Sequence, residues 1–219
     1  MGTMNMEITK FRLKGKTPLL GSICMDEKTY EEYLATKAKT DAERARAADD
    51  VKNVKSAEED ENPKATAFYK DEETNNIILK GYQIKGFLKE AAKALKDQIG
   101  LASYVSKIDN LVFIDEVNIP LMRNGEWVEH PDGMLERPLR ASTAQGPRVA
   151  LATSEVVYAP WYLDITVKVL QNSKTAKSAA LTMDVVKQLL DYGALKGLLQ
   201  WRNGGYGSFD TEVLEVIQE

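Results

Sequence analysis

The sequence has almost none of the residues that form disulfides and zinc sites. It contains one cysteine, Cys24, and one histidine, His130, among 219 residues. A single cysteine excludes an intrachain disulfide and is typical of proteins from a reducing compartment. One cysteine with one histidine also excludes the usual zinc clusters. We therefore expect a cytoplasmic protein that uses no metal and no other cofactor.

Long hydrophobic runs and catalytic signatures are missing as well. No apolar stretch reaches the roughly 18 residues that suggest a transmembrane helix, so we expect no membrane partner. The sequence has no nucleophile motif and no phosphate-binding loop. Asp115 and Glu116 are adjacent in an apolar stretch, and in a strand they would face opposite sides and could not share a metal. These absences favour a binding protein over an enzyme.

The net charge of −4 comes from one segment of the chain. Residues 26–64 hold 12 acidic and 8 basic residues, and the rest of the chain carries 21 of each. We interpret residues 26–67 as a charged insertion in one domain that spans 1–219, with a helix over 30–51 and a solvated linker after it. Because the remainder is neutral, the overall acidity does not decide whether a local surface binds nucleic acid.

Hydrophobic periodicity predicts the main strands and helices. Apolar and polar residues alternate in residues 7–20 and 161–170, which predicts strands. An apolar stripe at helical spacing runs through residues 81–99, and Thr182 marks the start of a second helix that ends at Gly193. Further strands are predicted over residues 107–121 and 208–217, and a β-hairpin over residues 137–160 with its turn at Gln145, Gly146 and Pro147.

The order strand, helix, strand, strand, helix, strand defines the predicted fold class. With right-handed crossovers, this is the order of a ferredoxin-like (βαββαβ) α+β fold. Such a fold is a four-stranded antiparallel sheet with two helices on one face, and its first and third strands lie in the centre. The charged insertion and the hairpin are additions to it. The sheet face without helices is open for binding.

A stretch at the start of the helix over residues 81–99 resembles the RAMP superfamily of CRISPR-associated proteins. That superfamily has the pattern hydrophobic-x-G-x-x-hydrophobic-K-G where its first helix begins. The stretch "IILKGYQIKGFLKEAAKAL" is similar to this segment. The matching residues are Leu79, Gly81, Ile84, Lys85 and Gly86.

The stretch "GLLQWRNGGYGSF" resembles the glycine-rich loop of the same superfamily, which lies between the second helix and the last strand. It departs from the pattern at Leu198 and Leu199, where a second glycine is usual. It is also similar in part to a "G-x-W-R-x-x-Y-G-x-F" ending of phage and prophage proteins. The resemblance is best over residues 77–99 and 181–217. It implies a phage or prophage protein of the host cytoplasm that has an RNA- or single-strand-binding surface, or a relative that has lost it.

Cations of the first strand and the glycine-rich loop form the predicted nucleic-acid site. Alternation places Lys10, Arg12, Lys14 and Lys16 on one face of the strand with no acid among them. In the ferredoxin-like order this is the open face, beside the last strand that the loop feeds. Cations would bind phosphates, glycines would let backbone N–H groups approach them, and an aromatic ring would stack on a base. The predicted loop residues are Trp201, Arg202, Gly204, Gly205, Tyr206 and Gly207.

Other interpretations of these residues remain open. The glycine-rich loop can instead be a tight structural loop whose aromatic side chains fill the core. The hairpin carries Arg137, Arg140 and Arg148, which either grip a nucleic-acid strand as a thumb or pack against Glu136 or Glu155. We include Arg140 and Arg148 in the predicted binding site.

We expect from these features a non-catalytic protein that binds single-stranded RNA or DNA. One alternative is a protein-binding phage factor that acts on a host defence or replication complex. Another is a metal-independent endoribonuclease of the RAMP type, in which His130 acts in general acid–base chemistry. His130 lies in the turn "EWVEHPDG" with no evident partner, which argues against that role. A host or phage protein and a second copy of the chain are the alternative partners.

Overall fold

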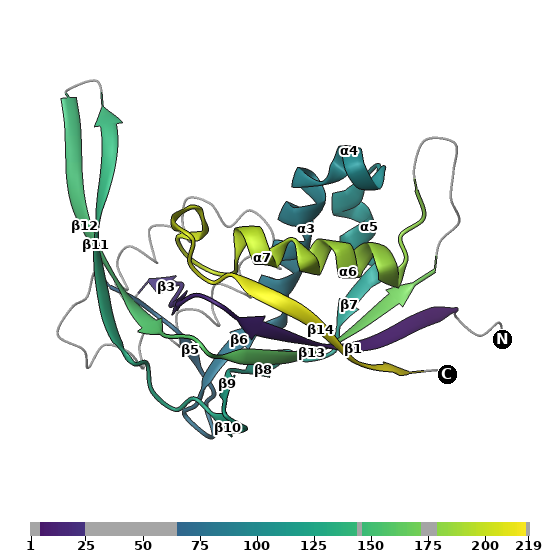
Figure 1. Cartoon of the computed structure of the whole chain (residues 1–219), viewed down its shortest axis with the longest axis horizontal. Coiled ribbons are helices and arrows are strands. Elements are labelled where there is room, and N and C mark those ends of the chain that lie inside the picture. The colour runs from purple at the N-terminus through teal and green to yellow at the C-terminus, as the bar shows by residue number, and fades with distance from the viewer. Residues whose placement is uncertain (1–4, 25–64, 144–145, 172–178, 218–219) are drawn as a thin grey trace.

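The computed structural model of the 219-residue chain describes residues 5–24, 65–143, 146–171 and 179–217. The helix predicted over residues 30–51, and all of the charged insertion before residue 65, lie outside the described residues. In the described part, helices lie on one side of a sheet, and a long hairpin extends away from both (Figure 1).

The central sheet is antiparallel and contains the path β7-β13-β1-β14. β1 (Met6–Gly15) pairs with β13 (Tyr162–Leu170) on one side and with β14 (Phe209–Ile217) on the other. The short β7 (Val112–Ile114) pairs with the second half of β13, and β9 (Met122–Arg123) pairs with its start. Every second residue of β13 is buried, so alternation fixes which face of the sheet meets the core. β9 also pairs with β10 (Glu126–Trp127).

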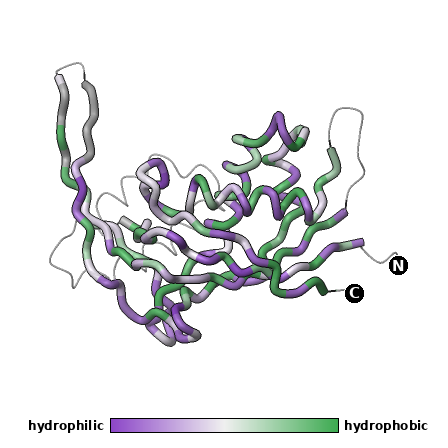
Figure 2. Tube along the Cα trace, viewed as in Figure 1, coloured by the Kyte–Doolittle hydropathy of each residue, from purple (hydrophilic) through white to green (hydrophobic). Residues whose placement is uncertain are grey.

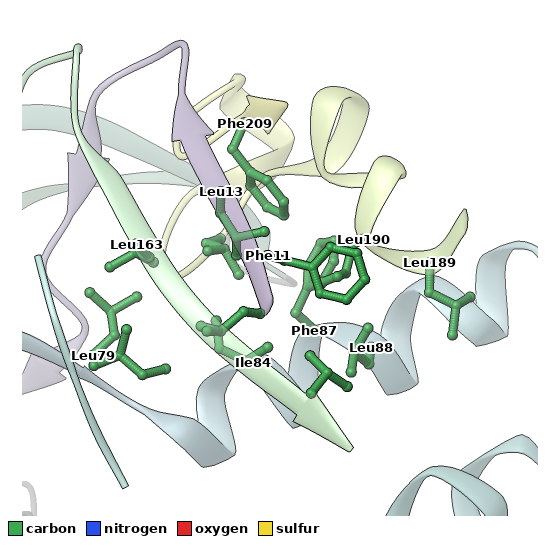
Figure 3. Close-up of a cluster of buried hydrophobic side chains, with 14 of the residues drawn as sticks. Phe11, Leu13, Leu79, Ile84, Phe87, Leu88, Leu163, Leu189, Leu190 and Phe209 are labelled. Atoms are coloured by element: carbon green, nitrogen blue, oxygen red, sulfur yellow. The ribbon is translucent and has the colours of Figure 1, made fainter. Parts of the chain in front are cut away.

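Helices cover one face of this sheet and enclose the core. α3 (Gly81–Ala94) and α6 (Met183–Asp191) bury apolar stripes at helical spacing. Hydrophobic and hydrophilic residues alternate along these elements (Figure 2), and the hydrophobic side chains meet between the layers (Figure 3). Ile84 and Leu190 of the helices thereby pack in one cluster with Phe11 of β1. The shorter helical segments are α4 (Lys96–Ile99), α5 (Tyr104–Leu111), α7 (Gly193–Lys196) and the 3-10 turn η1 (Arg202–Gly204).

A second sheet contains the long hairpin of β11 (Gly133–Thr143) and β12 (Gly146–Val157). Near the base of the hairpin, β12 also pairs with β2 (Leu19–Leu20) and with β4 (Thr66–Ala67). Between Gly146 and Thr153, β12 pairs only with β11 among the described residues. This outer part of the hairpin projects from the body (Figure 1). The remaining short strands are β3 (Ile23–Cys24), β5 (Tyr69–Lys70), β6 (Ile77–Lys80) and β8 (Asn118–Pro120).

The α+β class predicted from the sequence is confirmed. The helix predicted over residues 81–99 is present as α3 followed by α4. The predicted cap of the second helix is also present, because the Thr182 side chain accepts a hydrogen bond from the backbone N–H of Val185 at 3.4 Å. This bond satisfies one of the amide groups left unpaired at a helix start.

The strand predicted over residues 107–121 is wrong over residues 107–111, which belong to α5, and the remainder divides into β7 and β8. Tyr104, Ile108 and Leu111 are spaced by four and three residues, so they lie on the core-facing side of a helix. Gly193 does not end α6: it begins α7, and a Cβ there would lie 2.1 Å from the Phe209 ring. The predicted hairpin turn is placed too late, since β12 already begins at Gly146.

Candidate nucleic-acid interface

Three of the four cations in the predicted stripe form ion pairs with acids of the two neighbouring strands: Arg12 and Lys14 of β1, and Lys16 just after it. Arg12 donates from Nε and Nη2 to both carboxylate oxygens of Asp164 on β13, at 2.7 and 2.8 Å. This hydrogen-bonded pairing raises the pKa of Arg12 above its ordinary value. Lys14 pairs with Glu212 at 2.8 Å, and Lys16 pairs with Asp210 at 3.1 Å. The local positive charge predicted from β1 alone is therefore largely neutralised.

Two other lysines of the open face differ in their surroundings. Lys168 of β13 forms an ion pair with Asp115 at 2.7 Å. Lys10 lies opposite Thr166 on β13 and Glu215 on β14, and it forms no ion pair with the described residues. Lys10 is thus the member of the predicted stripe whose ammonium group remains available to a phosphate.

The glycine-rich loop is closed by close contact between its two ends. The backbone N–H of Leu198 donates to the carbonyl oxygen of Gly207 at 2.9 Å. Gly197 and Gly207 have φ angles of +78° and +70°. A Cβ would lie 2.2 Å from the Tyr206 carbonyl oxygen at Gly197, and 2.3 Å from the Leu198 carbonyl oxygen at Gly207. Both glycines are therefore required by the backbone itself, as the structural interpretation of the loop predicts.

The tip of the loop presents two stacked aromatic rings. The Trp201 and Tyr206 rings lie 5.0 Å apart with an interplanar angle of 22°. Trp201 itself has a φ of +52°, and Leu199 has a φ of +58°. Bulky residues in this left-handed region cost of order 1–3 kcal/mol each and concentrate at binding sites and catalytic centres. Both rings are half-buried, so each retains an accessible part.

The remaining predicted loop residues take different positions. Arg202 forms an ion pair with Glu90 of α3, and Lys196 lies 3.5 Å from the same carboxylate. Arg202 therefore lies against the helical layer, whereas the sequence predicts that it lies at the end of the β1 stripe. Gly204 lies against the Trp201 ring, where a Cβ would be 3.0 Å from ring atoms, and Gly205 is exposed with a φ of +85°.

Arg137 lies where the base of the hairpin meets the glycine-rich loop. Its side chain is 5% exposed, and its guanidinium carbon is 5.0 Å from the Trp201 ring centroid. Nη1 donates to Ser154 Oγ at 2.8 Å, and Nη2 donates to Gln200 Oε1 at 3.0 Å. Nε is buried and has no hydrogen-bond partner. Burial of the guanidinium lowers the pKa of Arg137, which the nearby Tyr206 partly offsets.

Neither acid considered from the sequence forms an ion pair with Arg137 among the described residues. Glu155 instead accepts a hydrogen bond from the backbone N–H of Phe68 at 2.7 Å. Gln200 and Ser154 are not recognisable as site residues from the sequence. The alternation of β12 could have placed Ser154 on the same face as Arg137, but no pattern could have placed Gln200 there.

The other predicted residues are more distant from this junction. Arg140 lies opposite Val149, and Arg148 lies opposite Ala141, in the projecting half of the hairpin. His130 is exposed between β10 and β11. Among the described residues, no group of three His, Cys, Asp or Glu side chains could hold a metal ion. In the same part of the chain, no helix is long and apolar enough to cross a membrane.

No protein-family model matches the sequence, and no curated protein matches it. Among solved structures, the chain is similar to one in the cryo-EM structure of the Type III-B Cmr-beta bound to cognate target RNA. The two are 10% identical with a TM-score of 0.48, over 97% of this chain and 60% of the other. The chain thus spans about 60% of the length of that neighbour, and at this TM-score the similarity assigns neither a family nor an activity.

Proposed function

We propose that the chain is a non-catalytic protein that binds single-stranded nucleic acid, either RNA or DNA, on a RAMP-like fold of the ferredoxin type. The strand order β14-β1-β13-β7 supports the fold assignment. Read in chain order, it is strand, helix, strand twice, with the first and third strands in the centre. The function rests on the loop and hairpin that are added to this sheet.

The observation that carries the proposed function is the stacked Trp201–Tyr206 pair on a strained loop. The two half-buried rings stack at 5.0 Å, and Trp201 has a left-handed φ of +52°, a strained backbone of the kind that clusters at functional sites. Aromatic rings of this kind form platforms on which bases of any sequence stack, each worth roughly 1–3 kcal/mol. A single strand lying across the loop would place a base on Tyr206, because Tyr206, Arg137 and Gly204 already lie against the Trp201 ring.

Cations around the loop would hold the phosphates of the same strand. A strand that extends beyond the loop would meet Arg140 and Arg148 in the projecting half of the hairpin, or Lys10 of β1 on the open sheet face. Arg12, Lys14 and Lys16 contribute less in this proposal. Each already forms an ion pair with a carboxylate, and a bound phosphate would have to compete with that carboxylate. The result is a short binding site centred on the loop, with a modest salt dependence.

Fluorescence anisotropy with labelled single-stranded RNA and DNA at several salt concentrations tests this function. Tyr206→Ala and Trp201→Ala should each weaken binding about 5- to 150-fold, the loss of one stacked base. Trp127→Ala is the matched control, because Trp127 is a 47% exposed tryptophan on the distant β10 and should not alter binding. If the wild-type protein binds neither nucleic acid at low salt, the proposed function is wrong.

A second candidate function, binding to another protein, is favoured by the exposed edge of β14. This strand has no sheet neighbour on its outer side among the described residues. It exposes Val213, Leu214 and Val216, at 42%, 39% and 65%, and the hydrophobic residues continue toward the end of the strand (Figure 2). An exposed apolar edge can accept a strand from a partner.

Mass spectrometry of the proteins that co-purify with the chain tests this second function. A partner that adds a strand should be recovered with the wild type and lost with Val213→Lys and Val216→Lys, since lysine protects an edge. Leu195→Lys, at an exposed apolar residue of α7, is the control and should retain the partner. Equal recovery with all variants would exclude β14 as the contact.

A further inference from the structure

We infer that Arg137 is a phosphate-binding residue, and that a phosphodiester of the bound strand supplies the anion that this buried guanidinium lacks. The inference deepens the proposed function and rests on it. Arg137 lies at the junction of β11 and the glycine-rich loop, next to the Trp201 ring, which supports the stacked Tyr206 ring.

Arg137 has no counter-charge among the described residues. Arginine is almost never fully buried unless it is paired, because the desolvation of its charge must be offset. Even Arg123, whose side chain is 28% exposed, is fully paired: it donates to both Asp132 oxygens at 2.8 and 2.6 Å, and to the carbonyl oxygens of Tyr158 and Pro160. Arg137 is 95% buried and has no carboxylate partner among the described residues.

The N–H donors of Arg137 also have a geometry that suits a phosphate. A guanidinium has five N–H groups in a flat fork, which matches the oxygens of a phosphate. Among the described residues, two neutral oxygens accept from Arg137, Ser154 Oγ and Gln200 Oε1, and none accepts from Nε. The side of the fork that contains Nε and Nη2 can therefore accept a phosphate if Gln200 leaves.

The two residues that accept hydrogen bonds from Arg137, Ser154 and Gln200, differ in how firmly they are held. Ser154 is fully buried in β12, and its Oγ lies 2.6 Å from Thr66 Oγ1, so this contact is fixed. Gln200 belongs to the loop and lies between Leu199 and Trp201, the two residues with left-handed backbone. Its neutral amide oxygen occupies the position of an anion, and rotation of its unbranched side chain opens that position. One nucleotide then has its phosphate on Arg137 and its base on Tyr206, whose ring stacks on the adjacent Trp201.

The test compares Arg137→Met with Arg137→Lys and with a charge-matched control. Lys187→Met removes the same charge from an exposed i,i+4 pair with Asp191 on α6, which includes none of the hydrogen-bond partners of Arg137. Arg137→Met should bind labelled single strands about 10- to 100-fold more weakly, the loss of one or two charge-assisted hydrogen bonds. It should also reduce the salt slope by about 0.7, the loss of one phosphate contact to a single strand. Arg137→Lys keeps the charge but not the fork, and should be intermediate.

Thermal unfolding without ligand separates a binding role from a structural one. Removal of an unpaired buried charge by an apolar side chain is often neutral or stabilising, so Arg137→Met should unfold at the wild-type temperature or above it. If Arg137→Met unfolds well below the wild type and Arg137→Lys, which still folds, binds as tightly as the wild type, then Arg137 is structural and the inference is overturned.

The outcomes also separate this inference from the proposed function. If the wild type binds oligonucleotides and Arg137→Met binds them equally well, the function stands and the inference fails. If the wild type binds none, inorganic phosphate is the second probe. A rise in the unfolding temperature of the wild type but not of Arg137→Met would then support an anion site for free phosphate and overturn the nucleic-acid source. No rise in either protein would overturn the inference as well.

Discussion

The open face of the central sheet and the base of the hairpin both carry cations, and they differ in what surrounds those cations. On the open face, Arg12, Lys14 and Lys16 each meet a carboxylate from an adjacent strand. At the hairpin base, Arg137 is more deeply buried than any of them and has no carboxylate partner among the described residues.

This difference shows that a row of cations in a sequence indicates little until the neighbouring strands are known. Exposed ion pairs contribute about 0–1 kcal/mol to stability and leave a nearly neutral surface. A buried guanidinium with neutral partners is unfavourable in the free protein, and an anion that binds it would offset this cost.

Opening the glycine-rich loop should remove the junction while leaving the open face intact. Gly197→Ala places a Cβ 2.2 Å from the Tyr206 carbonyl oxygen at a φ of +78°, so we expect the free energy of unfolding to fall by about 2–4 kcal/mol. Gly205→Ala is the control: it has a φ of +85° but open space around it, and should lose about 1 kcal/mol. Urea unfolding followed by tryptophan fluorescence measures both. Equal losses would show that backbone strain, and not the close approach, makes Gly197 necessary.

Replacing Arg123 should lower the free energy of unfolding, because Arg123 is ion-paired with Asp132. Replacing Arg137, which has no carboxylate partner among the described residues, should not. Arg123→Met leaves Asp132 without its cation, and we expect a loss of about 1.5–3 kcal/mol in the free energy of unfolding at neutral pH. The hydrogen bond from Arg123 holds the pKa of Asp132 below its ordinary value of 3.8. A carboxylate whose pKa is lowered by folding stabilises the folded state above pH 3.8, and this stabilisation is lost as the pH falls through the lowered value.

Urea unfolding from neutral pH to below pH 4 tests this pH dependence. The difference between wild type and Arg123→Met should shrink as Asp132 becomes protonated, and Arg137→Met should show no such change. A loss for Arg123→Met that persists at acidic pH would show that the contacts of Arg123 with backbone carbonyls, and not its ion pair, stabilise this region.

Removing the acids of the open face should turn it into a surface like the one predicted from β1 alone. In the triple variant Asp164→Asn, Asp210→Asn and Glu212→Gln, the paired cations of β1 lose their counter-charges. We expect oligonucleotide binding at low salt to strengthen roughly tenfold and the salt slope to steepen by up to about 2, for three added phosphate contacts. Asp109→Asn with Asp191→Asn frees Lys89 and Lys187 on the helical side as the control. A similar gain in the control would mean that net charge alone governs binding.

Much of the sheet could be predicted from the sequence because its signals are local. Alternation in β13 and the helical stripe of α3 each report one buried face, and Thr182 reports one helix start. The failure at α5 has a local cause too: the apolar residues 111–114 hide a helix that ends where β7 begins.

The candidate site could be predicted only in part, because its chemistry depends on pairs far apart in the chain. Asp164 lies 152 residues from Arg12, and Gln200 lies 63 residues from Arg137. Spacing within one segment cannot reveal such partners. The glycines and aromatic residues of the loop are recognisable as unusual from the sequence. Their spacing does not reveal that Gly197 and Gly207 lie against the backbone at the opposite end of the loop.

The smallest effect is expected at His130, which belongs neither to the open sheet face nor to the base of the hairpin. General acid–base catalysis needs an imidazole that a second group orients. His130 is exposed, and the nearest acid after it, Asp132, is already engaged by Arg123 and by the backbone N–H of Tyr158. His130→Ala should therefore change the free energy of unfolding by less than about 0.5 kcal/mol and leave oligonucleotide affinity unchanged. Any cleavage of labelled RNA in the presence of EDTA should proceed equally in wild type and variant, as expected of a trace contaminant. Selective loss of cleavage in His130→Ala, with Glu129→Gln still active, would instead establish the metal-independent endoribonuclease and make the junction its substrate-binding surface.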